Sequence, residues 1–310
     1  MRVLVTGVSG YVGAALVPRL QAAGHEVRGF ARSQERVAAA GVLLDDVVLG
    51  DAIRGAGLGR ALDGVDAAYY LIHSMETGGD VHSGFQDHER RAAERFATAA
   101  KAAGVRRVIY LGGLVPQTGA ASRHLASRVA VERALLETAA EPIAFRASIV
   151  IGARSRSFRF LVRLIERLPV LALPAWRTHA TQPIDGRDVL EFLVRAADAP
   201  AELAGRSWDI GGPEAMTYQQ LIARIAEHML VDRPAIPLGF SLTPVASVVA
   251  AAVAEEDPGF ITPLMESLES DLLPRHDDAA GAFGVRLHSF DAAVERALRE
   301  WEMTEEVAAK

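Results

Sequence analysis

Three glycines spaced three residues apart, Gly7, Gly10 and Gly13, lie in the segment VTGVSGYVGAAL near the start of the chain. They follow the apolar run VLV and open a stretch with helical patterning. The first N–H groups of a helix carry a partial positive charge, and residues without side chains let a pyrophosphate approach the backbone. The spacing therefore predicts a nucleotide-binding turn, and the alternative is a glycine-rich turn that only packs tightly.

The elements that would position this turn alternate between strand and helix. Strand-like apolar runs occur within 2–7, 25–31, 42–51, 64–73, 106–113 and 142–152, and helical patterns occur within 11–24, 33–41, 85–105 and 124–140. This alternation indicates βαβ units, and the nearly continuous apolar strands indicate a parallel sheet covered by helices on both faces. We therefore expect an α/β fold, a Rossmann-type doubly wound parallel sheet with a smaller, mostly helical C-terminal portion.

The strand–helix rhythm loosens after about residue 152. We expect residues 1–152 to form the dinucleotide-binding core and residues 153–310 to form a portion on the substrate side. Segments 182–198 and 205–213 again read as a strand followed by a helix or turn, and we expect them to return to the core.

Composition excludes several classes of protein. The 310 residues include no cysteine and carry a formal net charge of −6, so disulfides and zinc–thiolate sites are excluded and a basic nucleic-acid-binding block is absent. The longest apolar stretch, PVASVVAAAVA at 244–254, is too short to span a bilayer and reads as a buried or amphipathic helix. No signal-peptide pattern follows Met1. We expect a cytoplasmic protein and candidate homodimer that binds a small molecule, does not bind nucleic acid and has no membrane span.

The segment TGVSGYVG at 6–13 is similar to the glycine turn of the extended and atypical short-chain dehydrogenases/reductases. Further similar segments follow in the family's order: GD at 50–51, DAAYYLIHSM at 66–75, RASIVIG at 146–152, QPIDGRDV at 182–189 and GGPEAMTY at 211–218. The chain most resembles the subgroup described as NAD(P)-binding, nucleoside-diphosphate-sugar-epimerase-like or NmrA-like. The resemblance implies a nicotinamide dinucleotide held by Gly7, Ser9, Gly10, Tyr11, Val12, Gly13, Arg32, Asp51, Ala52, Leu71, Ile72, His73, Leu111, Gly112, Gly113, Arg128, Ala147, Ser148 and Ile149.

The end of the second strand bears on which dinucleotide is bound. Enzymes that use NAD place an Asp or Glu there to meet the ribose 2′-hydroxyl, whereas this chain has Ala31 followed by Arg32. An arginine pairs with a 2′-phosphate that an acid would repel. We therefore expect NADP(H) to be preferred over NAD(H), and the alternative is that Arg32 is an ordinary solvated side chain.

Active members of the family use a Ser, a Tyr and a Lys, and this chain has replaced all three. Gly112 and Gly113 stand near the Ser position, His124 stands at the Tyr position and Arg128 stands at the Lys position. A neutral histidine exchanges protons near neutral pH, and a neighbouring arginine would lower its pKa. Arg128 stays protonated and would hold a ribose hydroxyl or a phosphate. The alternative is a partly exposed helix face, and further candidate proton donors at this edge are Ser122, Ser127 and Tyr70.

Three functions remain open. The first is an NADP(H)-dependent reductase of a small apolar carbonyl, enone or quinone-like substrate, because the segments that line the nicotinamide look intact. The second is a dinucleotide-binding redox sensor, regulator or assembly factor without turnover, which the missing Ser-Tyr-Lys set favours. The third is a sugar-nucleotide epimerase or dehydratase, for which the only candidate basic cluster in the C-terminal portion is Arg154, Arg156 and Arg159.

Other chemistry finds little support. His82 and His88 lie among acidic residues, but their spacing matches no familiar metal-ligand set, and no GxSxG nucleophile elbow is present. An apolar substrate would need an apolar wall. Candidate wall residues, each also readable as ordinary core, are Phe158, Phe160, Trp176, Phe240, Val248, Phe260 and Met265.

Overall fold

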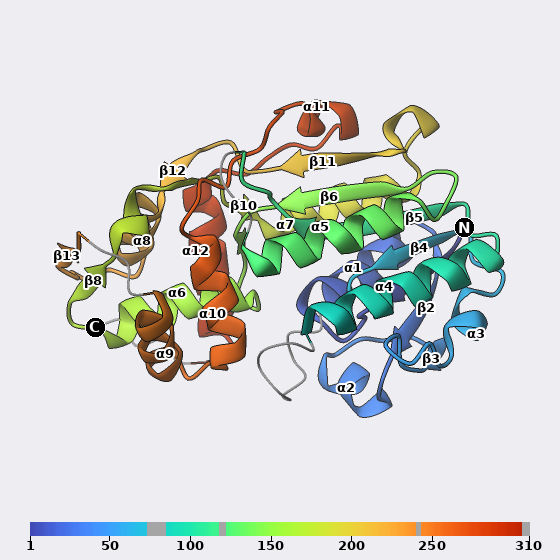
Figure 1. The fold of residues 1–310 in the computed structure, drawn as a ribbon, viewed down its shortest axis with the longest axis horizontal. Coiled ribbons are helices and arrows are strands. Elements are labelled where there is room, and N and C mark those ends of the chain that lie inside the picture. Colours follow the sequence, from blue (N-terminus) through green and yellow to red (C-terminus); the bar gives the residue numbers. More distant parts are fainter. Residues whose placement is uncertain (73–84, 118–121, 240–242, 306–310) are drawn as a thin grey trace.

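The computed structural model describes residues 1–72, 85–117, 122–239 and 243–305. Its centre is a seven-stranded sheet made of β1 (Arg2–Thr6), β2 (Glu26–Ala31), β3 (Val47–Leu49), β4 (Ala67–Tyr70), β5 (Arg107–Gly113), β6 (Ile143–Ala147) and β11 (Arg206–Ile210). All neighbouring strands are parallel, in the order β11-β6-β5-β4-β1-β2-β3 (Figure 1). The chain order reverses between β1 and β4, and at such a point the carboxyl ends of the strands leave a crevice.

Helices cover both faces of this sheet. One face carries α1 (Tyr11–Ala22), α2 (Gln34–Ala39), α7 (Gly186–Ala197) and α11 (Ala279–Phe283), and the other carries α3 (Leu58–Leu62), α4 (Phe85–Ala102) and α5 (Arg123–Leu136). Alternate residues of β1 enter opposite cores, since Val3 and Val5 pack toward α1 and Leu4 packs toward α4. The predicted doubly wound α/β fold is confirmed, and double burial explains the continuous apolar strands.

The C-terminal part builds a second core beyond the carboxyl edge of the sheet, and the arrowheads of β6 and β11 point toward it in Figure 1. Its helices are α6 (Arg156–Arg167), α8 (Tyr218–His228), α9 (Thr243–Ala254), α10 (Pro258–Ser267) and α12 (Phe290–Glu302), with short 3-10 turns at Ala175–Thr178 and Ala201–Leu203. Three two-stranded pairs connect them: β7 (Val150–Ile151) with β10 (Ile184–Asp185), β9 (Ala180–Thr181) with β12 (Met216–Thr217), and β8 (Leu171–Leu173) with β13 (Ala235–Pro237). Segment 206–210 leaves this part and pairs with β6 as strand β11.

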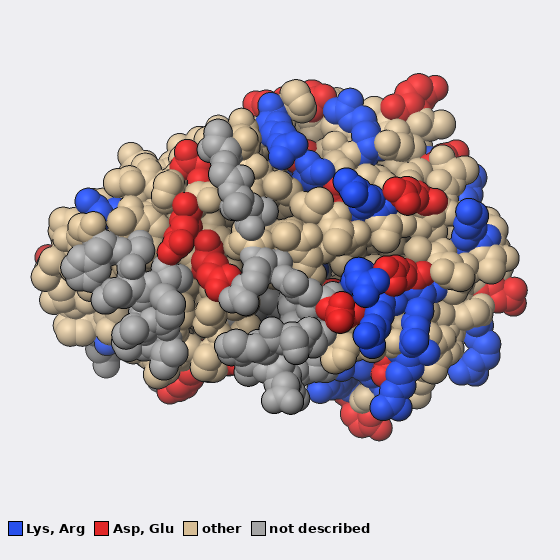
Figure 2. Space-filling model, viewed as in Figure 1, with Lys and Arg blue, Asp and Glu red and all other residues tan. Residues whose placement is uncertain are grey.

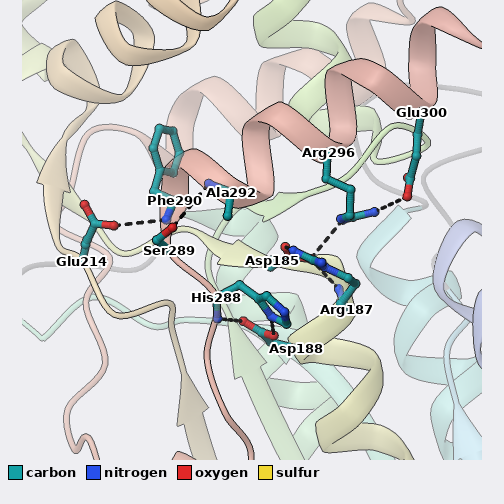
Figure 3. A network of polar contacts seen from close by, with 10 residues as sticks. All are labelled: Asp185, Arg187, Asp188, Glu214, His288, Ser289, Phe290, Ala292, Arg296 and Glu300. Atoms are coloured by element: carbon teal, nitrogen blue, oxygen red, sulfur yellow. Dashed lines mark hydrogen bonds and ion pairs between the residues drawn. The ribbon is translucent and has the colours of Figure 1, made fainter.

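A buried polar network ties the second core to the first (Figure 3). The Asp185 carboxylate caps α7 by accepting from the Arg187 amide at 2.7 Å, and it also accepts from the Arg296 guanidinium of α12 at 2.9 Å. One turn along α7, the buried Asp188 accepts from the backbone N–H of His288 at 2.8 Å. Because buried carboxylates are costly unless hydrogen-bonded, these contacts fix where α12 crosses the end of the sheet.

The described surface carries both signs of charge. Figure 2 shows Lys and Arg gathered on the side of the viewed face where α4 lies, with Asp and Glu among them. Arg90, for example, contacts Glu94 at 2.7 Å and Asp87 at 3.3 Å, so this basic side chain is paired along its own helix. Among the helices described, none has the length and apolar character needed to cross a bilayer.

The first residue of α1 joins three of the segments singled out from the sequence. The hydroxyl of Tyr11 fits between Gly152, after β7, and Gly186, the first residue of α7, and a Cβ at either glycine would clash with it. Burial raises the pKa of Tyr11 to about 12, so the hydroxyl stays neutral. The glycines of RASIVIG and QPIDGRDV thus make room for a side chain of the glycine turn.

We predict that Gly186→Ala destabilises the protein by about 1–3 kcal/mol, the usual cost of overpacking a tight site. Adding Tyr11→Phe should recover much of this loss, because removing the hydroxyl leaves the Ile151 carbonyl oxygen, at 3.2 Å, as the nearest neighbour of the new Cβ. Urea unfolding of both variants measures the change. Gly281→Ala in α11, where a Cβ meets nothing within 4 Å, is the matched control and should not destabilise. Full stability of Gly186→Ala would contradict this packing.

Candidate functional site

One cavity of about 420 Å³ opens at the carboxyl ends of β1, β4, β5 and β6. The structure brings to it every candidate cofactor-binding residue that it describes, from Gly7 in the glycine turn to Ile149 after β6. Both candidate catalytic residues, His124 and Arg128, line it as well. His73 lies outside the described residues. The cavity therefore joins segments that are spread over most of the chain.

The glycine turn is shaped by close contacts between backbones. Gly7 has φ +66°, and a Cβ there would lie 2.5 Å from the carbonyl oxygen of Leu71 after β4. A Cβ on Gly13 would clash with the Gly7 carbonyl oxygen, so α1 can begin directly against the turn only without that atom. The first turn of α1 contains no acidic residue, and its N-cap Gly10 supplies no side-chain acceptor. The helix N-terminus therefore faces the cavity with its N–H groups and partial positive charge available to an anion.

Two arginines line the cavity where the second strand ends. Arg32 is exposed directly after β2 and has no hydrogen bond or ion pair to another described residue. Arg36, on α2, also lines the cavity and was not singled out from the sequence. The sequence did hold a signal for Arg36, because it follows Arg32 by four residues and lies in the next helix. Asp51, after β3, uses one carboxylate oxygen to accept from the Ile53 and Arg54 amides at 2.8 and 3.2 Å, which shapes the turn that lines this end.

Arg128 is buried between α4 and α5 rather than on a partly exposed helix face. Its guanidinium lies 3.3 Å from a carboxylate oxygen of the buried Glu89, and the second oxygen accepts from the Ser127 hydroxyl at 2.8 Å. The Arg128 guanidinium, which the sequence predicted to hold a ribose hydroxyl or a phosphate, therefore also neutralises the buried Glu89 carboxylate. Glu89 itself was not recognised as a partner in the sequence.

His124, one turn before Arg128, is kept neutral by its surroundings. Burial, and to a lesser degree the nearby Arg128 charge, lowers the pKa of His124 to about 3. The expected direction is right, but the idea that this histidine exchanges a proton near neutral pH is wrong, because a desolvated imidazole does not take up the charge. Its Nδ1 is buried without a hydrogen-bond partner among the described residues. A neutral imidazole in this cavity can donate one hydrogen bond, and it cannot act as a general acid near neutral pH.

The three other candidate proton donors do not line the cavity. Tyr70 is buried against Phe96, with ring centroids 5.0 Å apart, because alternate residues of β4 point to the α4 face. Ser127 is committed to Glu89. Ser122 caps α5 by accepting from the Leu125 amide, and its hydroxyl lies 3.1 Å from that of Ser267.

The apolar wall differs from the one expected. Phe158, Phe160, Trp176 and Met265 are buried in the second core and do not line the cavity, and the side chains of Phe240, Val248 and Phe260 lie outside those described. The apolar lining near His124 is instead made of leucines that directly follow β5 or belong to α5, α10 and the segment after α10, namely Leu114, Leu125, Leu264, Leu268 and Leu272. Helix α10 and α5 are in contact, which brings these distant residues together. Sequence patterning missed them because a leucine that lines a cavity has the same periodicity as one in a core.

Tyr218, at the start of α8, also lines the cavity and was missed, although it ends the GGPEAMTY segment. Ser155, Arg156 and Ser157, at the start of α6, line it too. Of the basic trio in that region, Arg156 contacts Glu256 at 2.7 Å and Arg159 contacts Glu305 at 2.8 Å, while Arg154 donates to the Ala40 carbonyl oxygen. Within the described ranges, no three His, Asp or Glu side chains are grouped as metal ligands, and His82 falls outside those ranges.

Comparison with known proteins agrees with this geometry. Residues 7–140 match a protein family described as NAD(P)H-binding. Two solved structures share the fold. A nucleoside-diphosphate-sugar epimerase from Staphylococcus aureus superposes with a TM-score of 0.75 at 13% identity, covering 95% of this chain and 100% of that one. A short-chain dehydrogenase/reductase superfamily protein from Agrobacterium tumefaciens with bound NAD superposes with a TM-score of 0.70 at 20% identity, covering 98% of this chain and 96% of that one. The predicted NAD(P)-binding Rossmann domain and the likeness to short-chain dehydrogenases/reductases are confirmed.

Two curated proteins are similar in sequence. A (4-alkanoyl-5-oxo-2,5-dihydrofuran-3-yl)methyl phosphate reductase from Streptomyces griseus is 27% identical over 267 residues, which is 86% of each chain. The mitochondrial NADH dehydrogenase [ubiquinone] 1 alpha subcomplex subunit 9 of Arabidopsis thaliana is 28% identical over 169 residues. That second match spans 54% of this chain and only 41% of the plant subunit.

We predict that His124 makes stability more sensitive to acid. Its pKa is about 3 when folded and near the ordinary 6.5 when unfolded, so between these values only the unfolded chain binds the proton and stability falls as pH falls. Because one proton changes stability by at most about 1.4 kcal/mol per pH unit, wild type should lose up to about 2 kcal/mol more between pH 7 and pH 5 than His124→Gln. Urea unfolding at both pH values measures this difference. His276→Gln, at an exposed position, is the control, and equal losses in wild type and His124→Gln would refute the neutral state.

Proposed function

We propose that this protein is an NADPH-dependent reductase of an apolar carbonyl compound, most simply a conjugated enone. The observation that carries the proposal is that one cavity is lined both by an open glycine turn and by a wall of leucines, with a neutral imidazole among the lining residues. The open glycine turn suits a dinucleotide, the leucines suit an apolar substrate, and the neutral imidazole suits a carbonyl oxygen.

The dinucleotide would bind with its diphosphate at the N-terminus of α1 and its adenosine end toward β2 and β3. Arg32 and Arg36 lie where the 2′-phosphate of NADPH would be, and no acidic residue stands at the end of β2 to meet a 2′-hydroxyl. The turn shaped by Asp51 would bound the adenine. Arginine forms bidentate hydrogen bonds with phosphate, which supports NADPH over NADH.

The substrate would lie between the end of β5 and α10. The leucine wall offers dispersion contacts and few polar partners, so it favours an alkyl chain. The name of the Streptomyces reductase describes a carbonyl compound that carries an alkanoyl group, and that protein aligns with 86% of this chain. A substrate of the same general kind, a carbonyl with an alkyl tail, would suit this cavity.

The bound dinucleotide would supply the hydride, and the chain's own residues would orient the substrate and stabilise its oxygen. The neutral His124 can donate a hydrogen bond to a carbonyl oxygen without releasing a proton. The Arg128–Glu89 ion pair holds α5 against α4, and Arg128 helps burial to lower the pKa of that imidazole. With a substrate bound, the leucines would exclude water from around it, which would strengthen each of these polar contacts.

A dinucleotide-binding protein without turnover is the second candidate. It is favoured by Arg128, which already carries a buried ion pair with Glu89, and by the low pKa of His124, which removes it as a general acid. The similarity to a subunit of plant NADH dehydrogenase is compatible with such a role. A sugar-nucleotide epimerase is less well supported, because Arg156 and Arg159 contact carboxylates instead of forming an open diphosphate site.

We predict that Arg32→Ala weakens NADPH binding by about 10–100-fold, the equivalent of one charge-assisted hydrogen bond, and changes NADH binding less than twofold. Isothermal titration calorimetry with both dinucleotides measures this. Arg60→Ala, which removes an exposed arginine on α3, is the control and should change neither affinity. Equal affinities of wild type for NADPH and NADH would rule out the assigned preference.

We further predict that turnover rises with the alkyl chain of the substrate. With NADPH and a series of 3-alken-2-ones, kcat/KM should increase about fourfold for each added methylene that reaches the leucine wall, from ~0.8 kcal/mol per buried group. Leu264→Ala should flatten this dependence. The exposed Leu43→Ala is the matched control. Tight NADPH binding without turnover of any enone, ketone or quinone would support the non-catalytic candidate instead.

A further inference from the structure

We infer that three hydroxyls, Ser148, Thr181 and Tyr218, form a chain that ends in a hydrogen-bond donor for the substrate's carbonyl oxygen. This inference rests on the proposed reductase and assigns the donor within its site. Ser148 is half-buried directly after β6 and lines the cavity. Its Oγ lies 2.5 Å from Oγ1 of Thr181, the last residue of β9. Tyr218, the first residue of α8, lines the same cavity and neighbours Thr181.

The row of three hydroxyls has one more donor hydrogen than it can use within the row. Three hydroxyls carry three hydrogens, and only two contacts link them in a row: the hydrogen bond between Ser148 and Thr181, and the approach of the Tyr218 hydroxyl to Thr181. Thr181 is fully buried, so its hydrogen must go to a neighbour in the chain. The Tyr218 hydroxyl is buried and has no hydrogen bond of normal geometry to any other residue that the structure describes. If Tyr218 donates toward Thr181 and Thr181 donates to Ser148, the remaining hydrogen points from Ser148 into the cavity and needs an acceptor there.

The order of donation follows from the chemistry of the first member. A phenol is a better hydrogen-bond donor and a weaker acceptor than an aliphatic hydroxyl, so Tyr218 is assigned the donor's place beside Thr181; burial raises its pKa further, and the phenol keeps its proton. Each donation polarises the next hydroxyl, which makes the terminal Ser148 hydrogen a better donor than that of an isolated serine. Thr181 and Tyr218 are therefore positioning residues, and only Ser148 would touch the substrate.

The backbone holds these hydroxyls in place. Thr181 pairs with Met216 in the β9–β12 ladder and forms a bridge with Leu272, a member of the leucine wall. The Tyr218 amide donates to the His179 carbonyl oxygen at 3.0 Å, and its ring packs edge-on to Trp176 at 6.0 Å between centroids. A donor fixed before the substrate arrives stabilises developing charge without reorganising, which is the main requirement of an oxyanion site.

The position of Ser148 suits the reaction. Its neighbour Ala147 pairs with Gly113 at the end of β5, close to where a nicotinamide would lie across the strands. A bound NADPH would supply a hydride to the β-carbon of an enone, which would shift the π electrons to the carbonyl oxygen and leave NADP⁺. Ser148 and His124 would hydrogen-bond that enolate oxygen, and a water molecule would supply the proton that completes the saturated ketone. No protein group changes its proton count in this scheme.

The inference can be tested in a complex that cannot react. NADP⁺ carries no hydride to transfer, so trans-3-nonen-2-one bound with it should stay intact, and its C=O stretching frequency reports hydrogen bonding. We expect the C=O frequency to be lower in the wild-type complex than in the free enone. It should return to nearly the free value in Ser148→Ala, and only part of the way toward the free value in Thr181→Val and Tyr218→Phe. Thr181→Ser keeps the hydroxyl and should retain the wild-type frequency.

Kinetics with NADPH and the same enone give an independent readout. Ser148→Ala should lower kcat by about 10–100-fold, and Thr181→Val and Tyr218→Phe should each lower it less, with KM and NADPH affinity nearly unchanged. The double variant Thr181→Val/Tyr218→Phe should be no worse than Thr181→Val alone, because the chain is already broken. Thr138→Val is the matched control, because this buried threonine lies two residues after the end of α5 and donates to the Ala134 carbonyl oxygen.

Two failures can be told apart. If the enone is reduced but Ser148→Ala keeps the wild-type frequency and kcat, the hydroxyl chain is refuted and the reductase stands. If NADPH binds but no enone binds or is turned over, the reductase itself is refuted and the hydroxyl chain falls with it.

Discussion

The close contact of backbones at the glycine turn is the constraint on which the rest of this structure depends. Gly7 adopts a left-handed conformation beneath the Leu71 carbonyl oxygen, and α1 starts so near the turn that Gly13 has no room for a Cβ. This places the N-terminus of a helix at the point where the strand order reverses. The cavity, the partial positive charge at its floor and the adjacent strand ends all follow from that placement.

The same turn also organises the C-terminal part. The Tyr11 side chain extends from the turn and lies between Gly152 and Gly186. Asp185, which directly precedes Gly186, accepts a hydrogen bond from the Arg296 guanidinium of α12. A short series of contacts therefore runs from the glycine turn to the helices of the C-terminal part. Because each contact is buried, a change in one alters the packing of the next.

The polar side chains at the cavity are of two kinds, a buried ion pair and an uncharged imidazole. Arg128 and Glu89 neutralise each other inside the α4–α5 interface, whereas His124 is left uncharged by burial and by its arginine neighbour. An uncharged donor beside an apolar wall suits a neutral carbonyl better than an anionic sugar nucleotide. The cavity therefore combines a buried ion pair with an uncharged imidazole at the positions where the resemblance implied a Lys and a Tyr.

Sequence alone determined the features that depend on local backbone geometry. The glycine spacing, the alternation of strand and helix and the arginine after β2 are set by residues close together in the chain. They led to the fold and to residues that line the cavity at the carboxyl ends of the strands. Only the tertiary structure decided the partners of side chains far apart in sequence: Glu89 for Arg128, Thr181 for Ser148, and the leucines of α10 opposite α5. It also showed that Tyr70 points away from the cavity and that His124 is too buried to take up a proton. Burial and long-range contact set these properties, and no short pattern of residues records either.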